Sequence, residues 1–295
     1  MGAAVRSADI YPGLISLKRN ACDERSTLRS SPPHPALKSV STLASTVREL
    51  AAKKQRLGSS RVIDVICQLA SALSHAAAHG VCHRDVRLET VHLIAVGGCV
   101  HVALSGFDCA CSRSELDARR VPALSAESMP YRAPELLLNA HKCAMQFGTS
   151  DAWSLGCLFA RLLNAGPVFL ETADSEVPLL SDLFRKLGTP SPSALRILCD
   201  LEAAPLLQSV CAFRQPQPWQ RIIRGKRRLT ELDCLLLSRM LDWNPATRAS
   251  AAVVLSVLQA TATASGSPRP RHPRARLTAA PALAPIAEDD LSVPA

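Results

Sequence analysis

The chain has 295 residues, of which 47% are hydrophobic but only 4% aromatic, so aliphatic and alanine side chains must fill a sizeable core. Its net charge is +9, but no aromatic residues interleave with the basic clusters, which argues against a nucleic-acid partner. No apolar run reaches the roughly 18 residues of a membrane span, so no membrane segment is expected. The 11 cysteines are odd in number and lack paired spacing, which predicts free thiols in a reducing compartment, the cytoplasm or nucleus.

The predicted elements change in character near residue 46. The first 45 residues are irregular, and only short strands are predicted there. Apolar periodicity then predicts two helices, with Gly80 as the C-cap of the second. A β-rich stretch follows and is predicted to form two strands joined at Gly97 and Gly98. In chain order, these elements are strands at 13–19 and near 37–40, helices at 46–57 and 61–80, and the strand pair at 89–106.

Helices are also predicted throughout the second half of the chain. Thr230 is the expected N-cap of one of them, with Asp233 three residues later. From residue 261 the chain consists largely of Pro, Ala, Ser and Arg, which predicts a disordered basic tail. The predicted helices of this half span 150–166, 177–190, 229–245 and 249–260.

Several short sequences then appear in a characteristic order. They are "HGVCHRD", "GFD", "YRAPELLL", "SDAWSLGCLFARLL", "LFRKLGTPSPS" and "MLDWNPATRAS". In this order they resemble the large lobe of a eukaryotic Ser/Thr protein kinase. "YRAPELLL" and "LFRKLGTP" resemble the cyclin-dependent-kinase-like branch. The resemblance implies an α+β, protein-kinase-like fold. Residues 1–45 would be the remnant of a truncated β small lobe, 46–260 the helical large lobe, and 261–295 the tail.

The small lobe resembles the family only in pieces. Lys18 falls at the ATP-contacting lysine and Glu24 at its glutamate partner, although an active kinase places most of a helix between them. The glycine-rich phosphate loop is missing, and little chain remains for the hinge that binds adenine. Because the family's cyclin surface centres on the shortened helix, we do not expect a cyclin partner.

The catalytic positions of the family are only partly retained. Asp85 falls at the base position, and Arg87 replaces the catalytic-loop lysine. The two magnesium ligands of the family fall at Thr90 and Gly106, which supply no carboxylate or carboxamide oxygen. Asp108 is a weak substitute, because two residues of extended chain advance about 6.6 Å whereas a Mg²⁺–oxygen bond is about 2.1 Å. No cofactor is therefore expected.

The resemblance also assigns a set of scaffold residues. It implies that Glu135 and Arg248 form a buried ion pair and that Asp151 holds the backbone of the catalytic loop. His83 is expected to lie in the core, and Arg84 to contact groups of the activation segment. The assigned scaffold residues are His83, Arg84, Phe107, Glu135, Asp151 and Arg248.

Three hypotheses follow. The first is a pseudokinase, with a degenerate ATP site, that acts through protein partners. The second is an active Ser/Thr kinase that uses Asp85 as base and binds Mg–ATP in an unusual way. The third is a truncated gene product without independent function, because whole blocks of the small lobe are missing rather than single residues.

Overall fold

The structure is a computed structural model and describes residues 37–96, 99–113, 127–138, 147–164, 167–170, 176–198, 213–225 and 228–264. The strand predicted at 13–19 and most of the predicted tail lie outside these ranges. The strands are β1 (Leu37–Thr42), β2 (Val81–Cys82), β3 (Val91–Val96), β4 (Cys99–Leu104) and β5 (Cys111–Ser112). The helices are α2 (Leu43–Ala52), α3 (Ser59–Ala78), α4 (Pro134–Leu137), α5 (Thr149–Leu163), α6 (Glu176–Leu187), α7 (Pro192–Leu198), α9 (Trp219–Ile222), α10 (Glu231–Met240) and α11 (Ala251–Ala264).

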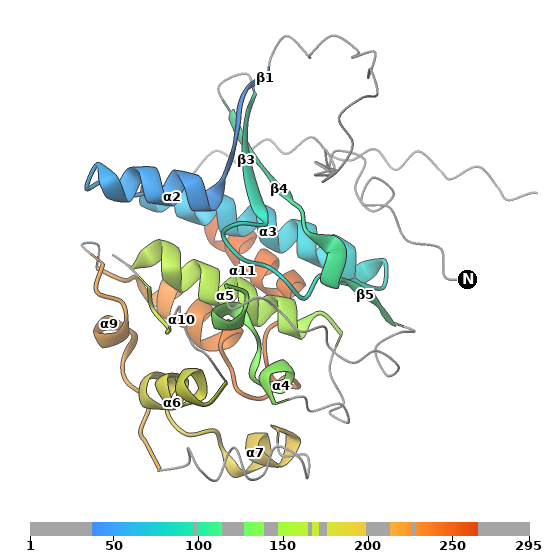
Figure 1. Cartoon of the computed structure of the whole chain (residues 1–295), viewed down its shortest axis with the longest axis vertical. Coiled ribbons are helices and arrows are strands. Elements are labelled where there is room, and N and C mark those ends of the chain that lie inside the picture. The colour runs from blue at the N-terminus through green and yellow to red at the C-terminus, as the bar shows by residue number, and fades with distance from the viewer. Residues whose placement is uncertain are drawn as a thin grey trace, which may run out of the picture.

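The sheet forms from the β-rich stretch that sequence predicts. β3 and β4 make an antiparallel hairpin across residues 97–98, and β1 adds antiparallel to the other edge of β3, giving the order β1-β3-β4. The sheet stands beside α2 and α3 (Figure 1). Gln68 of α3 joins the two layers, because its amide donates to the Val100 carbonyl at 3.2 Å and accepts from the Val102 N–H at 2.9 Å. These hydrogen bonds hold β4 against α3, and the residues that follow β4 belong to the candidate site.

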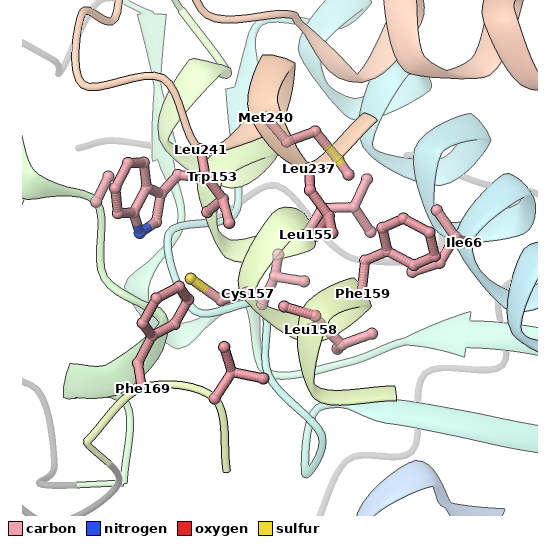
Figure 2. Packing of buried hydrophobic residues seen from close by; sticks show 14 of the residues in the cluster. Ile66, Trp153, Leu155, Cys157, Leu158, Phe159, Phe169, Leu237, Met240 and Leu241 are labelled. Carbon is pink, nitrogen blue, oxygen red and sulfur yellow. The ribbon is translucent and has the colours of Figure 1, made fainter. Parts of the chain in front are cut away.

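Helix α5 lies at the centre of the helical layer (Figure 1). Nearly all of its residues are buried, as expected for a helix enclosed on every side. Trp153, Leu155 and Phe159 point from it into the core, where they meet α3 and α10 (Figure 2). A Cβ on Gly156 would lie 2.9 Å from the Met240 Cβ, so the absence of a side chain there lets α5 and α10 approach closely.

The ends of several helices differ from the sequence-based expectation. Helix α2 begins at Leu43, where the Thr42 side chain accepts from the Ser45 N–H at 3.0 Å, and helix α11 continues to Ala264. The expected segment boundaries at 45/46 and 260/261 therefore fall inside helices, and residues 261–264 are not part of a disordered tail. Helices α4, α7 and α9 were not predicted, because four to seven residues are too few to establish a helical period.

The predicted helix caps can be located in the structure. Gly80 was predicted as the C-cap of α3, but the C-cap is His79, and Gly80 follows it with φ +72°. The predicted N-cap Thr230 is confirmed, and it forms a reciprocal capping box with Asp233 at α10. The cysteines in the described ranges are all free thiols. Within those same ranges, no helix is both long and apolar enough to cross a bilayer.

Candidate functional site

The loop between β2 and β3 is held in place by the first turn of α5. One carboxylate oxygen of Asp151 accepts from the His83 N–H at 2.7 Å, and the other accepts from the Arg84 N–H at 2.7 Å. Arg84 adopts φ +64°, a conformation that costs a non-glycine residue about 1–3 kcal/mol. The Asp151 carboxylate therefore stabilises a strained loop, and the expected role of Asp151 in holding this backbone is confirmed.

His83 is fully buried and neutral, and its ring connects the loop between β2 and β3 to the residues that follow β4. Its Nδ1 accepts from the Asp85 N–H at 3.2 Å, so Nε2 carries the proton and donates to the Ser105 carbonyl at 3.0 Å. Burial lowers the pKa of His83, although the nearby carboxylates oppose this effect. The Phe107 ring packs edge-on against the imidazole, with 4.5 Å between the ring centroids. The Arg84 Nε donates to the Cys109 carbonyl at 2.8 Å. Both contacts join the loop between β2 and β3 to the 3₁₀ turn Phe107–Cys109.

The Asp85 carboxylate is bound by Arg87 of the same loop. The Arg87 Nε donates to the two carboxylate oxygens at 3.2 and 3.3 Å. Its Nη1 reaches the other way, to Glu89 at 3.2 Å and to Glu127 at 3.1 Å. Burial disfavours the charged guanidinium, but the three carboxylates outweigh burial and raise the pKa of Arg87. Arg87 is thus a fixed cation that holds the Asp85, Glu89 and Glu127 carboxylates together.

Thr90 and Gly106 lie against each other. The Thr90 hydroxyl donates to the Asp85 carbonyl at 2.9 Å and accepts from the Arg87 N–H at 3.1 Å, so it serves the turn of the loop. Gly106 has φ +82°, and a Cβ placed on it would lie 2.8 Å from the Thr90 γ-methyl. The two positions meet as the resemblance implies, but a methyl group fills the space between them.

The donor set at this point does not fit a magnesium ion. Mg²⁺ prefers carboxylate and water oxygens in octahedral geometry, and neither Thr90 nor Gly106 supplies a carboxylate. Asp108 is exposed, on the short 3₁₀ turn Phe107–Cys109. Within the described part of the chain, no group of three His, Cys, Asp or Glu side chains is arranged to hold a metal. The residues at this point therefore do not form a magnesium site.

Glu135 and Arg248 form the predicted buried pair. The guanidinium donates to both carboxylate oxygens, at 2.6 and 2.9 Å, and both side chains are inaccessible to solvent. The remaining donors reach the Thr149 carbonyl at 3.1 Å and the Asp242 carbonyl at 2.9 Å, and the cation lies 5.0 Å from the Trp153 ring. This pairing joins α4 to the turn before α11, so the prediction from the resemblance is confirmed.

Two predicted site residues lie outside the described part of the chain, and two residues of the site were not predicted. Lys18 and Glu24 lie outside the described residues, so their predicted contacts stay a prediction. Glu89 and Glu127 belong to the site but were missed by the sequence reasoning. The alternating charges of Arg87 and Glu89 offered a weak signal, whereas no local pattern connects Glu127 with a residue 40 positions earlier.

Comparison with known proteins supports the kinase-like fold that the resemblance implies. A family model described as the protein kinase domain matches residues 38–258. A protein named "Protein kinase gsk3", from Schizosaccharomyces pombe, is 30% identical over 187 residues. That match covers 63% of this chain and 44% of the relative, so the chain spans less than half the length of the relative.

Proposed function

Because this chain belongs to the protein kinase family, with its α+β fold, we propose that it is a catalytically impaired, cyclin-dependent-kinase-like member that acts by binding other proteins. In this family the protein positions Mg–ATP and neutralises the charge that develops on the transferred phosphoryl group. A member that lacks those functions still has a folded surface, and other proteins can bind to that surface.

The observation that carries the proposal is the contact between Thr90 and Gly106. These residues stand where the family supplies its metal ligands, yet one offers a hydroxyl already engaged by the loop and the other has no side chain. An aspartate at residue 106 would also meet the Thr90 methyl group, because its Cβ would lie at 2.8 Å. Loss of the metal removes the main electrostatic contribution to phosphoryl transfer.

A thermal-shift measurement on the full chain tests the nucleotide part of the proposal. We expect no change in Tm with Mg–ATP at about 100 times the micromolar Kd of an ordinary kinase. A competent site would gain about 2.7 kcal/mol at that concentration, or roughly 5–10 °C for a domain of this size. The same titration with excess EDTA is the control. A metal-dependent rise of several degrees would refute the impaired-kinase proposal.

The alternative is an active Ser/Thr kinase that uses Asp85 as its base. The half-buried Asp85 carboxylate, held at 3.2 Å by the Arg87 cation, is the observation that favours it. Transfer of labelled phosphate from ATP to a mixed protein substrate would reveal such activity. Asp85→Asn must then abolish the transfer, and Asp108→Asn must reduce it if Asp108 replaces the missing ligand. Activity that both variants retain would come from a contaminating kinase.

The proposal also covers partners and compartment. We propose protein partners other than a cyclin, and the free thiols of the described residues fit a reducing compartment, the cytoplasm or nucleus. We propose no nucleic-acid partner, because the basic clusters lack interleaved aromatic residues.

A further inference from the structure

Cys82 and Cys111 lie opposite each other in the two-stranded sheet that β2 forms with β5. The Arg113 N–H donates to the Gly80 carbonyl at 3.0 Å, so these two residues are a hydrogen-bonded pair at one end of the ladder. Hydrogen-bonded and non-hydrogen-bonded pairs alternate along antiparallel strands, so the cysteine pair, two positions further on, is again hydrogen-bonded, with Cα atoms about 5.5 Å apart. Disulfides usually join Cα atoms that are about 4.4–6.8 Å apart. The backbone therefore holds the two cysteines at the spacing of a disulfide.

The two side chains lie on the same face and are in contact. Residues directly opposite in an antiparallel pair share a face of the sheet, and here the two thiols share a hydrogen bond. The Cys82 Sγ also lies 3.3 Å from the Ser150 Oγ and donates to an Asp151 carboxylate oxygen at 3.3 Å. Both cysteines are only 2% exposed, so each sulfur has the other as a neighbour and little contact with solvent.

The cysteine pair stands where two segments of the candidate site meet. Cys82 directly precedes His83, at the start of the loop between β2 and β3, and Cys111 follows the 3₁₀ turn Phe107–Cys109. Each strand of the β2–β5 ladder is two residues long, so few backbone hydrogen bonds join these segments. A bond between the two sulfurs would enclose residues 83–110 and fix both segments to each other.

The surroundings of the pair make its oxidation slow. The hydrogen bond with Cys111, burial and the Asp151 carboxylate raise the pKa of Cys82. Because the thiolate is the reactive form, a raised pKa keeps the thiol unreactive at neutral pH. A ladder of two residues can open locally, however, and an oxidant as small as hydrogen peroxide can then reach the sulfurs. We expect both cysteines to stay reduced until a peroxide is present.

We propose that Cys82 and Cys111 form a reversible disulfide in the presence of hydrogen peroxide, which makes the β2–β5 ladder a redox modification site. This inference goes beyond the proposed protein-binding role and does not depend on it. Intracellular disulfides of this kind are typically transient, so the proposal agrees with thiols that are reduced in the resting state.

The chemistry of the proposed step needs only the peroxide as oxidant. One sulfur attacks the O–O bond as a thiolate and becomes a sulfenic acid, and the hydroxide that leaves is protonated to water. The second thiol attacks the sulfenic sulfur, so that the S–S bond forms, the S–O bond breaks and a second water leaves. The sulfurs give two electrons to the peroxide, and the two thiol protons end in the two waters. A dithiol reductant reverses the step by thiol–disulfide exchange.

Mass spectrometry of the full chain tests the proposal. The reduced chain is incubated without denaturant in millimolar hydrogen peroxide, its remaining thiols are blocked with N-ethylmaleimide, and it is digested without reductant. We expect a linked peptide that contains Cys82 and Cys111 and that disappears after treatment with dithiothreitol. Cys99 is exposed and should be oxidised faster than the pair, so it reports that the peroxide is active.

Thermal unfolding shows whether the link forms in the folded chain. Closing a loop that contains residues 83–110 restricts the unfolded chain, so Tm should rise by about 5–10 °C. Dithiothreitol should return Tm to its starting value. If the linked peptide appeared while Tm fell, the link would have formed only in unfolded chains, and the proposal would be wrong.

Serine substitutions identify the two sulfurs. Cys82→Ser and Cys111→Ser should each abolish the linked peptide and the rise in Tm, and the hydroxyl of the first can still donate to Asp151. Cys99→Ser and Cys109→Ser are the matched controls and should retain both. If a serine variant is unfolded, the linked peptide and the rise in Tm of the native chain still decide the question.

Two results would overturn the assignment. In the first, the linked peptide joins Cys82 to Cys109 instead of Cys111. In the second, Cys82 and Cys111 remain unlinked after Cys99 has been fully oxidised. Because these measurements contain no nucleotide, phosphate transfer detected separately would refute the impaired-kinase proposal and leave the disulfide assignment standing.

Discussion

The Arg248 guanidinium is fully enclosed, and each of its three nitrogens donates at least one hydrogen bond. Arg248→Ala would leave Glu135 as a buried carboxylate without its cation, which typically costs about 3–5 kcal/mol. We expect the free energy of unfolding in urea to fall by that amount. Asp85→Ala should cost much less, because its Arg87 partner keeps Glu89 and Glu127.

Arg248→Lys is the control for this comparison. Lysine keeps the charge but cannot bond both oxygens of Glu135 in the planar fork seen here, so an intermediate loss is expected. If Arg248→Ala proved no more destabilising than Asp85→Ala, the ion pair would not have the structural role that its burial indicates.

His83 should make stability depend on pH. Burial holds the pKa of His83 below its usual 6.5, so above about pH 6.5 the imidazole is neutral whether the chain is folded or unfolded. As pH falls below that value, His83 becomes protonated in the unfolded chain but stays neutral in the folded chain. The free energy of unfolding therefore decreases. The decrease approaches about 1.4 kcal/mol per pH unit for one such group. Urea unfolding between about pH 7 and pH 5 measures it.

His83→Gln is the matched variant for this measurement. An amide can accept from the Asp85 N–H and donate to the Ser105 carbonyl as the neutral imidazole does, but it does not titrate. The dependence on pH should therefore flatten. Burial lowers the pKa of His92 as well, so a residual slope of the same sign is expected until His92→Gln is added. A native slope of opposite sign would contradict the neutral assignment of His83.

At the scale of elements, the contact between α5 and α10 depends on the missing side chain of Gly156. A valine there would place its Cβ within about 3 Å of the Met240 and Leu241 side chains. These side chains are packed in the core and have little room to shift. Overpacking of this kind typically costs about 1–3 kcal/mol, and the β-branch adds a smaller helical penalty. We expect Gly156→Val to lower the midpoint of urea unfolding without changing its slope.

Gly58, the N-cap residue of α3, provides the comparison. A Cβ there would meet nothing within 4 Å, and Gly58 already has an extended conformation that other residues adopt. Gly58→Ser should be neutral or slightly stabilising, because the hydroxyl can cap the helix. Equal destabilisation by the two substitutions would mean that loss of glycine as such, and not close packing, is responsible.

For the whole molecule, one continuous core joins the ends of the described chain. Its buried residues run from Leu43 in α2 to Leu258 in α11, and α3 packs on both α5 and α11. We expect limited proteolysis to leave a fragment close to 43–264, from the start of α2 to the end of α11, that unfolds in a single transition. Early cleavage within α5 or α10 would contradict this prediction, because it would require the centre of the core to open first.

Local patterns were sufficient for much of this architecture. Helical periods predicted α3, α5, α6, α10 and α11, and the paired glycines at 97–98 predicted the β3–β4 hairpin. These features depend on neighbours within a few residues along the chain. The ordered motifs of the resemblance also predicted the contact between Glu135 and Arg248, which are 113 positions apart.

Other features depended on the folded path of the chain. The sequence showed that Thr90 and Gly106 lack metal-binding groups, but only the structure brought the Thr90 methyl into the space beside residue 106. The contact of Arg87 with Glu127 likewise joins segments that no period or spacing relates. The physical reason is range: helix and turn preferences act over a few residues, whereas ion pairs and close packing form wherever the core brings distant segments together.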